Sequence, residues 1–291
     1  MISSRSLIRF ALAALCAAAV AHAQDRKKNP TSKVYVADTE GDTQIDIGTE
    51  IDDLVKKAVY NAEGTVIETK AVSNASVVLS NGTGVYFDVN TRVEIHDFSQ
   101  ESFRPNRSDI EDEPSISRLR MVVDYGVIGV STSKLVAGST MQFDTSLATA
   151  WIRGRQAVVS AGDNFTVISM VQGDATVQAG PMDTPHMIKN GQQVIVRPGK
   201  VGGPNNVVVQ EIPAGSDSEA EIWLEERVLT ADAARKLVYF EVEARKGSDD
   251  NISLFDAANS GDSAKEIVPV QVVPAIPPEQ PTVSAANLSG P

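Results

Sequence analysis

Apolar and polar residues alternate with a period of two along most of the middle of the chain, from residue 64 to about residue 198. Two apolar runs within 76–89 flank Asn81-Gly82, a pair that accepts the positive φ angles of a tight hairpin turn. The alternation returns at 119–125 and then at 140–144, 149–152, 156–160, 165–171, 174–178 and 193–197. Short alternating segments in close succession predict an all-β domain, an antiparallel β-sandwich or β-roll, with short flanking helices.

A segment before these strands has helical spacing instead. Its apolar residues recur at i, i+3, i+4, i+7 and i+8, namely Ile51, Leu54, Val55, Ala58 and Val59. With Thr49 as a candidate N-cap, the spacing predicts a short helix over residues 49–60. The β-branched Val55 and Val59 would also suit a strand. Residues 24–48, which precede this segment, are interpreted as a polar and acidic leader.

The chain changes character again after the strands. Ser218 and Glu221 have the spacing of a capping box, and the apolar residues behind them predict a helix. Residues 231–246 continue as a second helix or partly as a strand, so we expect a helical extension over 201–246. From residue 247 to 291, Ser, Asp, Asn and Pro predominate, a composition that buries too little apolar surface to offset the entropy of ordering. We predict a disordered tail there, with an extended Val-rich peptide motif as the alternative.

The first 23 residues have the organisation of a secretory signal peptide. Arg5 and Arg9 precede an uncharged apolar run, and residues 21–23 form an A-x-A cleavage site. The apolar run is shorter than the roughly 20 residues that a membrane-spanning helix needs. We therefore expect cleavage between Ala23 and Gln24 and export to the periplasm or the extracellular space, with no integral membrane segment in the mature protein.

Composition narrows the classes of partner and chemistry. The chain has 26 Lys and Arg against 38 Asp and Glu, a formal net charge of −12, which disfavours nucleic acid and anionic lipid as partners. The single cysteine, Cys16, lies in the signal peptide, which excludes disulfides and Cys-rich zinc sites. Residues 38–53 hold seven acidic residues and no Lys or Arg, but they lack the spacing of a calcium loop. A solvated acidic segment is favoured over a cation site.

The sequence shows no arrangement suited to catalysis. It lacks G-x-S-x-G, H-E-x-x-H, G-x-G-x-x-G and P-loop patterns. After signal cleavage two histidines remain, His96 and His186, and their wide separation favours surface or hydrogen-bonded structural roles. The sequence therefore predicts a protein that is not an enzyme and has no cofactor and no metal site.

Two arginines are the candidate contact residues. Arg153 and Arg155 stand two apart in a region of predicted strand, so they would point the same way and form a basic spot on an acidic protein. Such a spot suits a carboxylate, a phosphate or an acidic peptide, whereas ion pairs with the protein's own acids are the alternative. Trp151 and Trp223 could offer stacking faces to sugars or serve as core and interface residues.

The strand-rich segment from about residue 64 to 198 resembles the FecR domain, the periplasmic module named after the ferric citrate signalling regulator. The resemblance runs in order through 64–69, 76–83, 90–95, 119–126, 138–145, 151–154, 170–177 and 190–194, about half the chain. The family usually has Thr-Pro at 145–146 and Arg-Gly-Thr at 153–155, where this chain has Thr-Ser and Arg-Gly-Arg. In the family these positions look structural, so we expect the departures to affect the identity of the partner more than the fold.

The resemblance implies a FecR-like β domain over 49–200, with its core at 64–198, that contacts an envelope or secreted protein as a scaffold or in signalling. The family's regulators carry a cytoplasmic anti-sigma segment and a membrane helix where this chain has a signal peptide, so their transmembrane role is not carried over. We expect binding through an exposed strand edge or the acidic surface. A secreted adhesin or glycan-binding module is the alternative function, and a hydrolase is a distant third.

Overall fold

The computed structural model describes residues 32–101, 103, 111–213 and 218–237. Ala23, Gln24 and the tail 247–291 lie outside these ranges, as does the predicted signal peptide. The elements are β1 (Lys33–Glu40), β2 (Thr43–Asp46), β3 (Ile51–Asp53), β4 (Val59–Asn61), β5 (Thr65–Thr69), β6 (Asn74–Leu79), β7 (Gly84–Phe87), β8 (Thr91–Gln100), β9 (Ser117–Ser131), β10 (Thr140–Asp144), β11 (Thr149–Ile152), β12 (Gln156–Gly162), β13 (Phe165–Gln172), β14 (Asp174–Gln178), β15 (His186–Lys189), β16 (Gln192–Arg197), β17 (Asn206–Glu211) and α2 (Glu219–Leu237).

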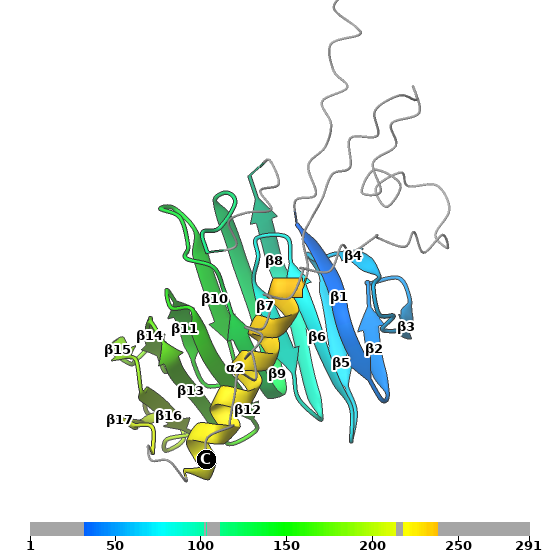
Figure 1. Ribbon diagram of the computed structural model, residues 1–291. Coiled ribbons are helices and arrows are strands. Elements are labelled where there is room, and N and C mark those ends of the chain that lie inside the picture. Colours follow the sequence, from blue (N-terminus) through cyan, green and yellow to red (C-terminus); the bar gives the residue numbers. More distant parts are fainter. Residues whose placement is uncertain (1–31, 102, 104–110, 214–217, 238–291) are drawn as a thin grey trace, which may run out of the picture.

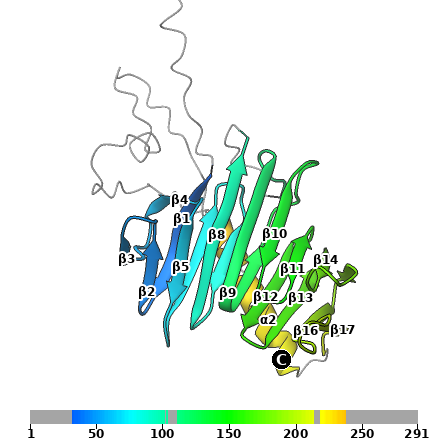
Figure 2. The same ribbon diagram turned by 180° about the vertical axis from the view of Figure 1, so that it is seen from behind.

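The strands form two layers that share β9 (Figures 1 and 2). Sheet 1 has the order β4-β1-β6-β7-β9-β12-β13-β16-β17. Sheet 2 has the order β3-β2-β5-β8-β9-β10-β11-β14-β15. The predicted all-β class is confirmed. The arrangement is mixed, because β9 and β10 run parallel while the other pairs of described strands are antiparallel.

The shared strand β9 passes from sheet 2 to sheet 1 at Gly126. Its first part pairs with β8 and β10, and its last part pairs with β7 and β12. Gly126 has φ +96°, and a Cβ there would lie 2.3 Å from Oγ1 of Thr91. Only glycine satisfies both the backbone angle and the close approach. The N–H of Val127 donates to the same Thr91 hydroxyl at 2.9 Å, which fixes the crossing point.

One hydrophobic core fills the space between the sheets. Val34 and Val36 from sheet 1 belong to the same buried cluster as Ile45 and Ile67 from sheet 2. The largest fully buried side chains include Phe87, Phe98, Phe143, Leu119, Met121 and Ile128. Each aliphatic or phenylalanine side chain of this kind contributes about 1.5–3 kcal/mol when buried, so the core accounts for the sandwich.

The N-terminal part of the domain differs from the sequence prediction. The leader expected over 24–48 contains β1 and β2, whose Val34, Val36 and Ile45 are almost fully buried. The sandwich therefore starts at Lys33 rather than at residue 49. The exposed Asp38 and Glu40 at the end of β1, together with Asp42 and Asp46 beside Ile45, give this segment the composition of a solvated leader.

The helix predicted over residues 49–60 is wrong. This segment holds β3 and β4 instead, joined by a turn in which Lys57 has φ 69°, an angle that no α-helix contains. Leu54 and Ala58 are buried, but the side chain of Ile51 is 66% exposed. The apolar residues therefore do not share one face, although their spacing matches a helical repeat.

Helix α2 lies across the outer face of sheet 1 (Figure 1). The N–H of Glu221 donates to Oγ of Ser218 at 3.3 Å, as the predicted capping box requires. Leu224, Val228 and Ala231 form the buried side of the helix. The expected helical extension over 201–246 is therefore correct from Glu219 to Leu237 but misses the strand β17. Within the described part of the chain α2 is the one helix, and it lacks the sustained apolar stretch that crossing a membrane requires.

Candidate functional site

The outer faces of the two sheets differ in whether another element covers them. Helix α2 covers the outer face of sheet 1, whereas no described helix or strand lies over the outer face of sheet 2 (Figures 1 and 2). An uncovered sheet face that carries ordered polar and aromatic side chains is a surface on which a partner can dock. The outer face of sheet 2 is therefore the candidate site, and the seat of α2 explains why the other face is closed.

The seat of α2 is built on two glycines of sheet 1. A Cβ on Gly84 would lie 2.2 Å from the carbonyl oxygen of Ala231, and one on Gly129 would lie 2.5 Å from that of Arg227. The helix backbone therefore rests directly on the sheet. Any larger residue at either position would have to lift it.

Polar contacts secure the helix at both ends of this seat. Nε of Arg227 donates to Oδ2 of Asp88 at 2.8 Å, and the two side chains are only 11% and 12% exposed. The same guanidinium lies 3.7 Å from the ring centroid of Trp223, a cation–π contact that occupies one face of this candidate sugar-stacking ring. Near the C-terminal end, Arg235 donates to Oδ1 of Asp232 at 3.0 Å, and Ser131 donates to that carboxylate at 3.0 Å.

A transverse row of side chains crosses the open face of sheet 2. The strand register places Arg120 of β9 opposite Gln142 of β10, Gln142 opposite Trp151 of β11, and Trp151 opposite Thr176 of β14. Nε1 of Trp151 donates to Oε1 of Gln142 at 3.1 Å, which orients an indole that is 36% exposed. We call Arg120, Gln142, Asp144, Thr149 and Trp151 the outer row.

Asp144 connects the members of the outer row. Its carboxylate accepts hydrogen bonds from Nε of Arg120 at 2.6 Å, from Nε2 of Gln142 at 3.0 Å and from Oγ1 of Thr149 at 2.7 Å. Burial alone would raise the pKa of Asp144, but the hydrogen bonds from Thr149, Arg120 and Gln142 outweigh it and lower the pKa. The carboxylate is therefore ionised at neutral pH, and it holds the arginine and the amide in fixed orientations.

A shallow hollow adjoins one end of the outer row. Its volume is about 310 Å³, and its rim includes Asp97, Arg118, Arg120, Thr140 and Gln142. The row and the hollow together offer a guanidinium, an amide, a carboxylate and an indole on one face. Such a set can bind carboxylates and peptide groups by hydrogen bonds and can stack against an apolar or sugar ring.

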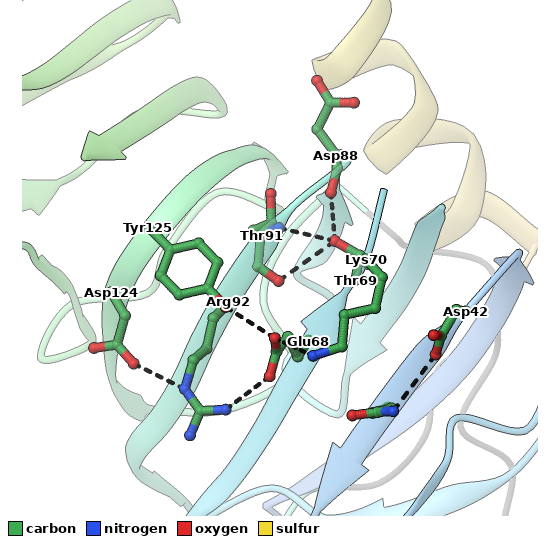
Figure 3. A network of polar contacts seen from close by, with 10 residues as sticks. Asp42, Glu68, Thr69, Lys70, Asp88, Thr91, Arg92, Asp124 and Tyr125 are labelled. Atoms are coloured by element: carbon green, nitrogen blue, oxygen red, sulfur yellow. Dashed lines mark hydrogen bonds and ion pairs between the residues drawn. The ribbon is translucent and has the colours of Figure 1, made fainter. Parts of the chain in front are cut away.

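A second polar network lies on the same face, on the β5 and β8 side (Figure 3). Glu68 accepts hydrogen bonds from Lys70, from the hydroxyl of Tyr125 at 2.8 Å and from Arg92 at 3.0 Å. Arg92 also donates to Asp124 at 3.2 Å. The hydrogen bond from Lys70 is the main cause that lowers the pKa of Glu68. Burial raises this pKa, whereas the hydrogen bonds from Tyr125 and Arg92 lower it further. With its charges mutually satisfied, this network braces β5, β8 and β9.

The predicted contact pair, Arg153 and Arg155, lies in the turn between β11 and β12 rather than within a strand. Arg153 is exposed. Nη1 of Arg155 lies 2.6 Å from Oε2 of Glu111, the kind of ion pair that was the alternative to partner binding. Gly154 separates the two, and a Cβ there would lie 2.5 Å from the carbonyl oxygen of Gln172. The turn therefore places the two arginines in different environments, with Arg153 as the more accessible one.

The remaining candidates have local partners. Nδ1 of His96 lies 2.9 Å from Oε1 of Glu94, and Nε2 of His186 lies 3.1 Å from Oδ1 of Asp183. In the described ranges no three His, Cys, Asp or Glu side chains gather in a group that could hold a metal ion, and this includes residues 38–53. The sequence pattern singles out Trp151 as a candidate but not Arg120, Gln142 or Asp144. The sequence shows that these three residues occupy polar positions in alternating strands. It does not show the parallel pairing of β9 with β10, which brings them together.

Comparison with known proteins gives only distant similarity. No family model matches the chain, and no curated protein matches it. The chain is similar to two crystal structures, at 1.65 and 2.50 Å resolution, of a "putative anti-sigma factor" from Parabacteroides distasonis ATCC 8503. In each case the TM-score is 0.37 and the sequence identity is 16%, over 50% of this chain and 59% of that protein. The chain thus matches less than two thirds of the length of that protein.

Proposed function

We propose that this chain is an exported, non-enzymatic FecR-like module that binds a protein partner in the cell envelope through the outer row, as a scaffold or in signalling. The observation that carries the proposal is the contrast between the two faces. Sheet 1 is closed by a helix seated on Gly84 and Gly129, while sheet 2 exposes Trp151 beside a charged network held by Asp144.

The chemistry of the outer row favours a peptide-like partner surface. Exposed Trp and Arg side chains are enriched in protein interfaces because each combines a large contact area with directional hydrogen bonding. Arg120 is 43% exposed at its side chain even though Asp144 binds it, so its remaining N–H groups can reach a partner carboxylate or carbonyl. The proposed partner therefore presents acceptor groups and one apolar side chain.

The test is capture from envelope extracts with the wild-type chain and with Trp151→Ala and Arg120→Ala. We expect both variants to lose the specific partner while their circular dichroism is unchanged. Phe165→Ala and Arg197→Ala are matched controls, because these residues are exposed and belong to sheet 1. Equal capture by all five proteins would contradict the outer row as the site. Arg153→Ala/Arg155→Ala tests the turn separately.

Glycan binding is the second candidate, and one observation favours it. The exposed ring of Trp151 has the amide of Gln142 and the side chains of Asp144 and Thr149 around it, and such polar groups bind sugar hydroxyls. A glycan array distinguishes the two functions. Binding of a defined glycan that is lost in Trp151→Ala would support this candidate, whereas an array without signal would argue against glycan binding.

A further inference from the structure

Four strands end the two sheets, and their compositions differ. β3 and β4 have three residues each, and β3 carries Asp52 and Asp53. β15 has four residues and ends in Lys189. β17 has the sequence NVVVQE, with no Lys, Arg or Pro and no acidic residue before Glu211. Natural proteins protect edge strands with charge, proline or shortness, and β17 has none of these from Asn206 to Gln210.

The ladder between β16 and β17 determines which backbone groups of β17 are free. The N–H of Ile212 donates to the carbonyl of Gly191 at 2.6 Å, and the register continues as Ile195 opposite Val208. Hydrogen-bonded pairs alternate along an antiparallel ladder, so residues 206, 208 and 210 bond to β16. The N–H and C=O groups of Val207 and Val209 therefore point away from the sheet, where no described strand pairs with them.

The side chains of β17 extend the hydrophobic core to an open rim. Val207 and Val209 lie opposite Val196 and Val194, which are fully buried between the sheets. Val209 nevertheless remains 43% exposed, because within the described residues the core is not closed beyond β17. Val208, on the outer face of sheet 1, is 51% exposed. The edge thus exposes apolar groups on both faces together with unpaired backbone groups.

We infer that β17 is a homodimer interface, at which a second copy of this chain adds its own β17 in antiparallel orientation. The argument for a second copy is the self-complementarity of the strand. A two-fold axis at Val208 places Val207 opposite Val209 of the partner copy, so the outward backbone groups of both exchange hydrogen bonds.

The same axis also matches the side chains by face. Val207 and Val209 of the partner copy extend the two cores into one, Val208 meets its own equivalent, and Asn206 faces the amide of Gln210 of the partner copy. No like charges come opposite one another over these five positions, in a chain with a formal net charge of −12. The two acidic copies would therefore meet along a strip of the surface that carries no charge.

The experiment is sedimentation velocity of the full-length chain over a concentration series, with three substitutions. Val209→Pro removes an N–H that does not bond to β16, so it should leave the fold intact and abolish the dimer. Val208→Lys places two cations opposite each other and should weaken dimerisation at least about tenfold. Val201→Lys is the matched control, because Val201 is fully exposed in the loop before β17, and this variant should dimerise like the wild type.

A mixture of Val208→Lys and Val208→Glu should restore dimers, because only a two-fold axis at this residue brings the opposite charges together. Amide hydrogen exchange at Val207 and Val209 should slow as the protein concentration rises. The inference is overturned if the wild type stays monomeric up to about 1 mM, or if Val209→Pro dimerises normally. Exchange protection that does not depend on concentration would also overturn it, because another part of the same chain would then cover the edge.

Discussion

Gly129 lies so close to the carbonyl oxygen of Arg227 that a Cβ on Gly129 would come within 2.5 Å of it. One strand away, Gly84 stands in the same relation to Ala231. Two glycines on neighbouring strands thus form the track on which α2 rests. This track closes the outer face of sheet 1, whereas no described element covers the outer face of sheet 2.

The first prediction concerns this track. Gly129→Ala and Gly84→Ala should each destabilise the protein by about 1–3 kcal/mol, because the new methyl group meets helix backbone that cannot move without losing its contacts. Chemical denaturation measures the change. Gly203→Ala is the comparison variant, since a Cβ there would meet the carbonyl oxygen of Lys200 at 3.3 Å, a milder approach than at Gly84 or Gly129. Equal stability of Gly129→Ala and the comparison variant would show that α2 is not seated on the glycine.

The second prediction concerns the ion pair that anchors the helix. Asp88→Asn should cost about 2–3 kcal/mol, because Arg227 would keep its charge in a largely buried position without a carboxylate. Arg227→Met should cost a similar amount, and it also removes the contact with the ring of Trp223. A double-mutant cycle measures the coupling between the two residues. Costs that simply add would mean that the pair contributes no interaction energy.

The third prediction is a pH dependence at Glu68. Its pKa in the folded state is lowered, chiefly by the hydrogen bond from Lys70, whereas the unfolded chain has the ordinary value of about 4.3. The contribution of Glu68 to stability is therefore complete above the unfolded pKa and is lost as the pH falls through the folded pKa. The stability difference between wild type and Glu68→Gln should shrink as the solution is acidified below about pH 4.

Carboxyl-carbon NMR titration reads the pKa of Glu68 directly. Lys70→Met should bring that pKa back toward its ordinary value, because it removes the largest cause of the shift. Glu63→Gln serves as the control for losing one surface carboxylate, since Glu63 is exposed. A stability difference that stays constant from neutral to acid pH would show that the network around Glu68 does not depend on its charge.

Local patterns were sufficient for much of the fold. The predicted strands at 140–144, 149–152 and 174–178 coincide with β10, β11 and β14, because alternation of buried and exposed residues is a property of each strand alone. The hairpin at Asn81-Gly82 is confirmed by Gly82, whose φ is 86°. The N-cap at Ser218 could be predicted from the spacing of Ser218 and Glu221 alone.

Features that depend on distant parts of the chain were not predictable in this way. β1 pairs with β4 and β6, so its burial is decided by residues 59–61 and 74–79 rather than by its acidic surroundings. The outer row requires β10 to lie parallel beside β9, and sequence spacing does not encode that arrangement. The segment between β8 and β9 shows the same limit, because Glu113 lies in a run of charged residues and yet is only 4% exposed.

Glu113 is the subject of the last prediction. This buried carboxylate accepts hydrogen bonds from four neutral donors: the hydroxyls of Ser117 and Ser139, the N–H of Val136 at 3.2 Å and the amide of Asn81 at 3.4 Å. These donors belong to the start of β9, the segment between β9 and β10, and the turn between β6 and β7. A single side chain thus ties together three segments that are distant in the sequence.

Glu113→Ala should destabilise the protein by about 2–4 kcal/mol, because it leaves several buried donors without an acceptor. Glu113→Gln should cost less, since it keeps the side-chain volume and one acceptor oxygen. Glu101→Ala, an exposed glutamate at the start of the same loop, is the control and should change stability by less than about 0.5 kcal/mol. Thermal and chemical unfolding give these values. If Glu113→Ala were as stable as the control, the carboxylate would not be the element that joins the three segments, and the hydrogen bond from Asn81 to Ser117 at 3.0 Å would have to hold the turn to β9.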